Sequence, residues 1–201
     1  MVSSLVPDRK VTVEDVKYLL SSHYQGTPFN PYTGQDTGLR GHYRSIGINR
    51  TGVTVLCQIR PDVPDEIKGV EWISFGSTTF SAMLPVYTNV SRMPKYLSDV
   101  TLDTSTENWY WASRLIGALA DPVYSGCIQN IERYQDKVAV RGRQILLEYD
   151  RKIAQGADVS LLQEANEALA GMAKEETTDA LNKILQTASE HMKNGFNLAD
   201  H

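Results

Sequence analysis

Two short polar segments near the amino end of the sequence hold side chains that could do chemistry. They are His23-Tyr24-Gln25-Gly26-Thr27-Pro28-Phe29 and Tyr43-Arg44-Ser45. The guanidinium group of Arg44 is a planar fork that matches a carboxylate through two parallel hydrogen bonds. A surface salt bridge is the alternative role for such an arginine. Arg44 is therefore the strongest single candidate for a functional side chain in this region.

The first segment offers two candidates for binding a substrate, His23 and Thr27. His23 closes a predicted helix, where an imidazole in the last turn interacts favourably with the helix dipole and needs no substrate. The alternative is that His23 lines a pocket together with Tyr24 and Thr27. Gly26 lies between them and suits a turn that needs positive φ. Both interpretations remain open, and we predict His23 and Thr27 as substrate-binding residues.

Two more residues, His42 and Ser81, complete the predicted site. His42 precedes Arg44 by two positions, so both side chains would point to the same side of a strand that began there. Ser81 lies in an irregular run before Leu84, where its hydroxyl could hydrogen-bond a substrate, although a local turn is the commoner role. No Gly-x-Ser-x-Gly segment surrounds Ser81, so a serine nucleophile is not expected.

The composition excludes several classes of function. Twenty basic residues against 24 acidic ones give a net charge of -4, and no basic stripe is present, so we expect no nucleic-acid partner. Cys57 and Cys127 lack metal-ligand spacing, and the acidic residues lack the alternation of a calcium loop, so no metal site and no cofactor are predicted. No apolar run approaches the roughly 20 residues that span a bilayer. The sequence predicts a cytoplasmic protein with free thiols and no membrane partner.

The elements that must position these residues change character at about residue 105. Before it, we expect a helix over 11–24 that starts at a Thr12–Asp15 capping box, and then a loop over 25–41. Apolar residues occupy both alternating sets of the run 53–60, which predicts burial on both of its faces. Strands are expected at 43–48, 53–60 and 70–74, with a hairpin turn at 49–52 and a fourth or irregular strand at 80–87.

After residue 105 the hydrophobic pattern is helical. The predicted helices cover 107–120, 122–154, 160–173 and 178–194. The first would take Ser105 or Thr106 as its N-cap, and the charged run 174–176 is predicted to be a solvated helix start. The organisation that follows is an α/β part at 1–104 and a helical region at 105–201.

Seven pieces of sequence, in order, carry a resemblance to a known family. They are HYQGTP (23–28), RS (44–45), CQIRP (57–61), WISFG (72–76), FS (80–81), LPVY (84–87) and NWYW (108–111). Over about residues 11–155 the chain resembles the dipeptidase A-type family of N-terminal nucleophile (Ntn) cysteine hydrolases, to which secernins are related. The tail after residue 156 is similar only in being helical.

This resemblance implies an α+β fold, a partial Ntn-type αββα sandwich with few antiparallel strands, followed by a helical C-terminal region. It also implies cleavage of dipeptides by an amino-terminal cysteine whose own α-amino group acts as the base. By the same resemblance Arg44 would be catalytic. It would lie near the nucleophile and either stabilise the thiolate or hold the carboxylate of the dipeptide.

The sequence departs from the family in one respect. It begins Met-Val-Ser, and neither Cys57 nor Cys127 can be an amino terminus without loss of most of the matching region. We therefore expect the C-terminal portion of a dipeptidase, whose nucleophile lies on a missing N-terminal segment. The alternative is a non-catalytic helical interaction or assembly protein derived from the same fold. A homo-oligomer, in which strands pair between copies, is a further open possibility.

Overall fold

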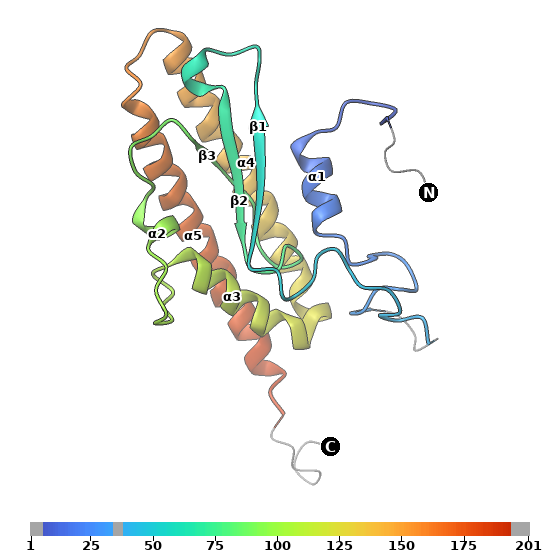
Figure 1. Ribbon diagram of the computed structural model, residues 1–201. Helices are drawn as coiled ribbons and strands as arrows, with labels where there is room; N and C mark the ends of the chain where they lie inside the picture. The colour runs from blue at the N-terminus through green and yellow to red at the C-terminus, as the bar shows by residue number, and fades with distance from the viewer. Residues whose placement is uncertain (1–5, 34–37, 194–201) are drawn as a thin grey trace.

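The computed structural model describes residues 6–33 and 38–193 (Figure 1). In this part of the chain three antiparallel strands form one sheet in the order β1-β2-β3. They are β1 (Val53–Ile59), β2 (Gly69–Phe75) and β3 (Leu84–Tyr87). The α-helices are α1 (Val13–Leu20), α2 (Lys95–Ser98), α3 (Trp109–Ala120), α4 (Tyr124–Ala154) and α5 (Leu161–Glu190), with short 3-10 turns η1 (Asp65–Ile67) and η2 (Asp121–Val123).

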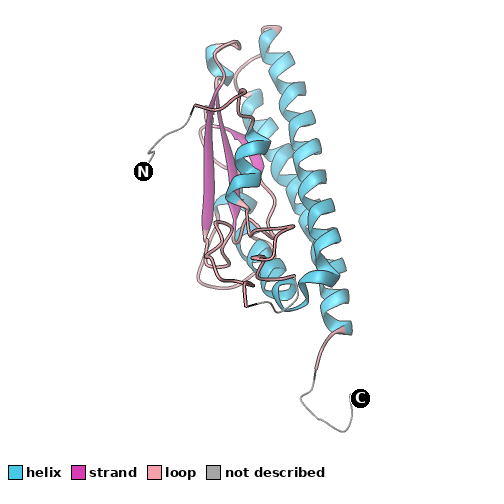
Figure 2. Cartoon of the chain, turned by 90° about the vertical axis from the view of Figure 1, so that its right-hand side faces the viewer, coloured by secondary structure: helices cyan, strands magenta, loops and turns pink. Residues whose placement is uncertain are grey.

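The described strands precede residue 105 and the three longest helices follow it, which confirms the predicted α+β fold class. The division into domains at residue 104 stays a prediction. Helices α4 and α5 lie side by side along the sheet (Figure 2). Among the described residues, no helix has the length and apolar character needed to cross a bilayer.

Strands β2 and β3 contribute side chains to a buried cluster on each face of the sheet. Trp72 and Tyr87 share a face and belong to a buried cluster with Leu146 of α4 and Leu162 of α5. The opposite face carries Ile73, Leu84 and Val86, which join Trp109 of α3 and Leu169 of α5 in a larger buried cluster. Alternation of side chains along β2 and β3 therefore fills two cores at once.

The expectation that β1 is buried on both faces is wrong. Its side chains alternate between half-buried and exposed, and Val53, Val55 and Ile59 are 52%, 45% and 80% exposed. The register places Val55 opposite Ile73 on the second face of the sheet. Helices α3 and α5 cover that face at β3 and β2, but nothing in the described chain covers it at β1. We call Val53, Val55, Cys57 and Ile59 the open strip.

The predicted strand at 43–48 is also wrong, and so is the hairpin turn after it. Residues 38–50 contain turns and bends instead. The backbone N–H of Gly47 donates to the carbonyl of Ser22 at 2.8 Å, and Thr79 Oγ1 donates to the carbonyl of Gly47 at 3.0 Å. These bonds tie the segment to the end of α1 and to the loop after β2, where a strand ladder cannot form. The hairpin that exists joins β1 to β2.

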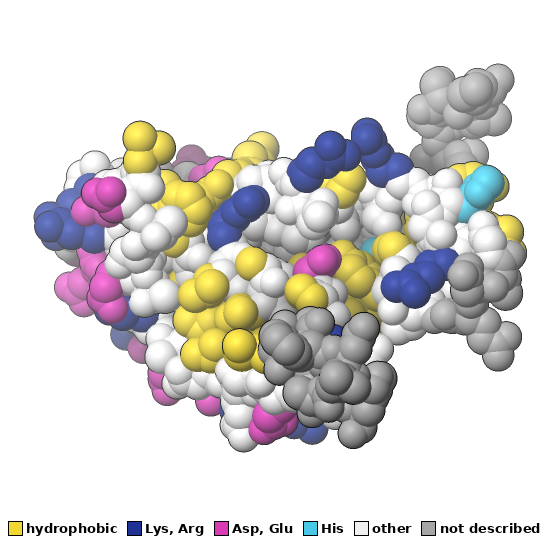
Figure 3. All heavy atoms as spheres, turned by 90° about the horizontal axis from the view of Figure 1, so that it is seen from below, with side chains coloured by type: hydrophobic (Ala, Val, Ile, Leu, Met, Phe, Trp, Pro, Cys, Tyr) yellow, Lys and Arg dark blue, Asp and Glu magenta, His cyan; other side chains and the backbone are white. Residues whose placement is uncertain are grey.

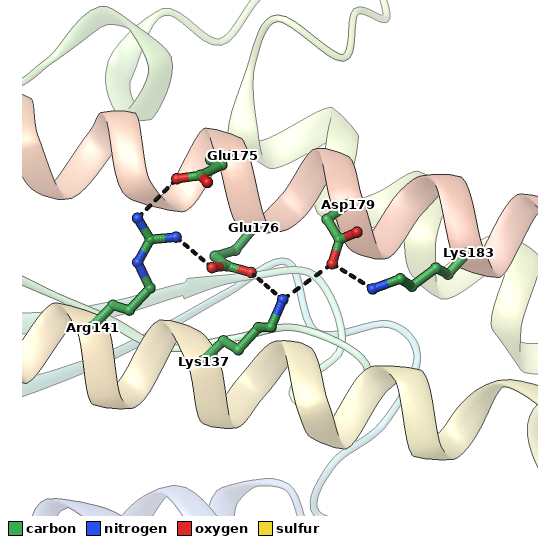
Figure 4. Close-up of polar contacts among 6 residues, drawn as sticks. All are labelled: Lys137, Arg141, Glu175, Glu176, Asp179 and Lys183. Carbon is green, nitrogen blue, oxygen red and sulfur yellow. Dashed lines mark hydrogen bonds and ion pairs between the residues drawn. The ribbon is translucent and has the colours of Figure 1, made fainter.

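The two helices predicted at 160–173 and 178–194 form the single helix α5. No Gly or Pro separates them, and Thr178 Oγ1 bonds back to the carbonyl of Lys174 within the helix. The charged run 174–176 is consequently mid-helix, and Glu176 is buried rather than solvated. Figure 4 shows Glu176 between Arg141 and Lys137 of α4.

The remaining expectations about helix ends are mixed. The Thr12–Asp15 capping box at the start of α1 is confirmed, with both reciprocal bonds present. The helix is shorter than predicted, so His23 lies two residues beyond the C-cap Ser21 and not in the last turn. Asn108 caps α3, in place of the predicted Ser105 or Thr106, by accepting bonds from Tyr110 N and Trp111 N.

Candidate functional site

Four of the five predicted site residues lie on the segment that runs from the end of α1 to Ile48. Both ends of this segment are held by the loop after β2. Thr78 Oγ1 donates to the carbonyl of Leu20 at 2.7 Å, and Thr79 Oγ1 donates to the carbonyl of Gly47 at 3.0 Å. We call this segment, residues 21–48, the site loop, of which residues 34–37 lie outside the described part of the chain.

Aromatic contacts bring the two ends of the site loop together. The ring centroids of Phe29 and Tyr43 are 4.9 Å apart, and those of Tyr24 and Tyr43 are 6.1 Å apart. Tyr24 has a φ of 59°, which is uncommon for a residue other than glycine. Residues 23–29 and the segment Tyr43-Arg44-Ser45 are thus neighbours in space, as their grouping in one predicted site requires.

The side chain of His23 is buried inside the protein. Its Nδ1 lies 3.0 Å from the carbonyl of Ser21, which can only accept, so Nδ1 carries the proton. In the neutral ring Nε2 then accepts a bond from the hydroxyl of Tyr124 at 2.9 Å. Both nitrogens are occupied by structural partners. The substrate-binding role of His23 stays a prediction, and in this structure the ring anchors the site loop to α4.

Thr27 lies at the exposed surface of the site loop. Its Oγ1 donates to the carbonyl of Tyr24 at 2.7 Å and accepts from the N–H of Phe29 at 3.2 Å. These two bonds close a local turn. The predicted substrate-binding role of Thr27 is not tested by this geometry.

Arg44 and His42 are both exposed on the site loop. The Arg44 guanidinium forms no ion pair with any described residue, and only the Arg44 carbonyl is engaged, by the hydroxyl of Tyr24 at 3.5 Å. The ring of His42 meets the ring of Tyr43 edge-on at 4.8 Å. The guanidinium is exposed, and the catalytic role of Arg44 stays a prediction.

Ser81 lies apart from the other four and is buried beside the sheet. Its hydroxyl donates to the carbonyl of Ser77 at 2.9 Å and lies 2.7 Å from the hydroxyl of Ser74. Gln135 of α4, which the sequence analysis did not single out, donates from Nε2 to the carbonyl of Ser81 at 3.0 Å. The predicted substrate role of Ser81 remains untested, and its observed bonds shape the loop after β2.

The two cysteines are free and differ in environment. Cys57 is exposed on β1, and Cys127 is buried in α4, where desolvation raises the pKa of its thiol. A thiol with a raised pKa is a poor source of thiolate. Within residues 6–33 and 38–193, no three His, Cys, Asp or Glu side chains are grouped in a way that could hold a metal ion.

Sequence reasoning missed a small cavity of about 210 Å³ next to the loop after β2. Arg114 and Asp121, seven positions apart, are among its lining residues. This spacing could have indicated the cavity from the sequence, because residues seven apart share one face of a helix. The small residues Gly117 and Ala118 lie between the two charges on that face.

Comparisons with known proteins place the chain in a family. Residues 2–137 match peptidase family C69, and the chain belongs to that family. It is 42% identical over 195 residues to a probable dipeptidase A of Streptococcus pyogenes, covering 96% of this chain and 41% of that protein. It is 37% identical to a dipeptidase of Bifidobacterium longum, covering 96% and 44%. A dipeptidase A of Lactobacillus helveticus is 32% identical, with 96% and 41% covered. The chain spans about two fifths of the length of these curated relatives.

Proposed function

We propose that this chain contributes one wall of the substrate pocket of a dipeptidase, with Arg44 as its principal charged group. The observation that carries the proposal is the exposed Arg44 guanidinium, on a loop that buried polar bonds hold in place, in a chain of peptidase family C69. The site loop provides a defined position for a charge that has no ion-pair partner among the described residues. Such a charge is suited to a substrate carboxylate or a thiolate.

The reaction itself requires a nucleophile, which we propose to be an amino-terminal cysteine supplied from outside these 201 residues. Its thiolate would attack the amide carbon while its own amino group moves the proton. Donors near the site would stabilise the tetrahedral oxyanion. The positions of Cys57, in the middle of a strand, and Cys127, buried in a helix, support the proposal that neither performs this role. We propose a cytoplasmic location for the whole protein.

The test combines this chain with a segment that carries the proposed amino-terminal cysteine and measures hydrolysis of dipeptides. We expect activity in the mixture, a loss of about a hundredfold or more in kcat/KM on Arg44→Ala, and partial retention in Arg44→Lys, which keeps the charge but not the fork. Arg50→Ala is the matched control, since Arg50 is another exposed arginine nearby, and it should leave kcat/KM unchanged.

Two outcomes would count against the proposal. Thiol-dependent hydrolysis by the purified chain alone would show that the nucleophile lies within it. Full activity of the mixture carrying Arg44→Ala would remove Arg44 from the site while leaving the dipeptidase function in place.

A second candidate function is assembly without catalysis, which the open strip favours. An uncovered apolar strand invites pairing with a further strand or a second copy. Light scattering of the purified chain tests this candidate. A dimer that dissociates on Val55→Lys would support it, whereas a monomer at all concentrations would exclude self-assembly.

A further inference from the structure

The cavity beside the loop after β2 is lined by Asn49, by residues of that loop, and by residues of α3 together with Asp121 after it. Its volume of about 210 Å³ is below the ~300–1,000 Å³ of sites for drug-sized molecules, so its ligand must be small. The lining residues that matter for recognition are Asn49, Ser77, Phe80, Arg114, Ala118 and Asp121. On the end of the molecule seen from below, hydrophobic surface lies between basic and acidic side chains (Figure 3).

Two exposed residues of opposite charge, Arg114 and Asp121, line this cavity. Arg114 lies in α3, and Asp121 follows it in helical conformation, with φ −55° and ψ −49°. Seven residues of helix are almost two full turns, so both side chains leave the same face about 10.5 Å apart along the axis. Among the described residues neither Arg114 nor Asp121 forms an ion pair. Asp121 also interacts with Tyr32, because the pKa of Tyr32 is raised first by burial and then by the charge of the Asp121 carboxylate and a hydrogen bond to it. A dipeptide ammonium would therefore share this carboxylate with the Tyr32 hydroxyl.

Small and apolar residues occupy the space between the charges. Gly117 and Ala118 lie one turn from each of them and leave the room that a larger side chain would fill. A Cβ at Gly117 would lie 3.6 Å from the buried ring of Phe80, which also lines the cavity. Ser77 is also buried, and its hydroxyl has no hydrogen-bond partner in the described part of the chain. Along α3 the lining of the cavity thus runs from a positive residue through two small residues to a negative one.

We propose that this cavity binds the dipeptide by its two charged ends, with its carboxylate on Arg114 and its α-ammonium on Asp121. The proposal rests on the proposed dipeptidase function and names residues that recognise the substrate. An extended dipeptide spans about 7 Å, and a charge-assisted hydrogen bond of about 2.8 Å at each end matches the charge separation once the side chains adjust. A tripeptide is longer by about 3.5 Å. Arg44 is then left for the role beside the nucleophile.

The test is the binding of L-alanyl-L-alanine to the full chain, measured by calorimetry beside two blocked analogues. N-acetyl-alanyl-alanine lacks the ammonium, and alanyl-alanine amide lacks the carboxylate. We expect the chain to bind the free dipeptide and to bind either analogue, or trialanine, about tenfold more weakly. In Arg114→Gln the preference for the acid over the amide should disappear. In Asp121→Asn the preference for the free amine over the acetylated form should disappear.

Two further variants control for folding and position. Ala118→Leu fills the cavity with a good helix former at an exposed position, so the fold should persist while binding is lost. Arg151→Gln, an exposed arginine at the far end of α4, should bind the dipeptide like the unaltered chain. Circular dichroism of each variant confirms that the helices are retained.

The inference is overturned if the unaltered chain binds no dipeptide at millimolar concentration, or if both blocked analogues bind as well as the free dipeptide. It is also overturned if Arg114→Gln and Asp121→Asn leave the affinity unchanged. These failures differ from a failure of the proposed function. Binding without hydrolysis in the mixed enzyme removes the dipeptidase proposal alone, and hydrolysis that needs Arg44 but neither Arg114 nor Asp121 removes this inference alone.

Discussion

At the scale of single residues, the fully buried amide of Asn166 forms the two hydrogen bonds with β3 that a neighbouring strand would otherwise form. Its Oδ1 accepts from the N–H of Tyr87 at 2.9 Å, and its Nδ2 donates to the carbonyl of Tyr87 at 3.0 Å. At Tyr87, the last residue of β3, both backbone polar groups are thereby paired by a buried side chain of α5. A buried backbone group without a partner lowers the stability of the folded chain. The Asn166 amide therefore stabilises both the packing of α5 and the end of β3.

Replacing Asn166 by leucine should therefore destabilise the protein strongly. The change leaves the N–H and the carbonyl of Tyr87 unpaired, at about 1–3 kcal/mol for each buried group. Gln163→Leu is the matched control on the same helix, because the amide atoms of Gln163 are buried without partners in the described chain. Urea unfolding should show a large loss for Asn166→Leu and no loss for Gln163→Leu. Equal losses of unfolding free energy in the two variants would mean that the hydrogen bonds of Asn166 do not stabilise the fold.

His23 shows how far a sequence can predict a residue's position. The residue was singled out by its type and by its place near a helix end. Its partner Tyr124 is 101 positions away, and no local pattern connects the two. The structural contact follows only from the packing of the site loop against α4. The exposure of Arg44, in contrast, agrees with the polar residues that surround it in the sequence.

At the scale of elements, a network of charges joins α4 to α5 (Figure 4). Arg141 bonds both Glu175 and Glu176, and Lys137 bonds Glu176 at 3.1 Å. The side chain of Glu176 is only 7% exposed, whereas that of Glu175 is 67% exposed. Burial alone would raise the pKa of Glu176, but the bonds from Arg141 and Lys137 outweigh it and lower the pKa.

The lowered pKa of Glu176 makes the stability of the helix pair depend on pH. A carboxyl whose pKa is lower in the folded chain stabilises it fully above the unfolded value of about 4.5, and this contribution is lost as the pH falls through the folded pKa. Glu176→Gln should cost about 1.5–3 kcal/mol at pH 7 and much less near pH 3. The measurement is the urea midpoint at both pH values.

Glu175→Gln is the control for that experiment, because Glu175 pairs with the same Arg141 at the surface. It should cost no more than about 1 kcal/mol at pH 7. A loss for Glu176→Gln that stays constant from pH 7 to pH 3 would contradict the assigned role of the charge.

The elements themselves were predicted with uneven success, for physical reasons. Strands β1 and β2, helix α3 and helix α4 follow from hydrophobic period and from Pro and Gly at their ends. The break predicted in α5 is wrong because Arg141 and Lys137 of α4 pair with Glu176, so this charged residue is buried in mid-helix. The strand predicted at 43–48 was wrong because contacts with Ser22 and Thr79 determine that segment.

At the scale of the whole molecule, the site loop depends on one close approach of backbones. A Cβ at Gly47 would lie 2.6 Å from the carbonyl oxygen of Ser21 and 2.8 Å from Thr79 Oγ1. Distances under 3.0 Å cannot be accommodated without a shift. Three parts of the chain, the end of α1, the site loop and the loop after β2, therefore meet at a point where only glycine fits.

Gly47→Ala should push the site loop away from this junction. We expect a loss of about 1–3 kcal/mol in unfolding free energy, as for overpacked sites, together with reduced dipeptide turnover in the mixed enzyme. Gly52→Ala is the control, since a Cβ at Gly52 meets nothing within 4 Å and should be tolerated. If Gly47→Ala were as stable and as active as Gly52→Ala, the junction would not position the site loop.

Because Cys57 is exposed and Cys127 is buried, the rates at which the two thiols are alkylated can report on what covers the sheet. Cys57 lies on the open strip, where an alkylating reagent can reach it, whereas Cys127 is buried with a raised pKa and should react slowly. Any strand, second copy or longer segment that covers β1 must slow the labelling of Cys57 without changing that of Cys127. The alkylation rate of Cys57 therefore reports, in solution and without any substrate, whether another strand or chain covers the open strip.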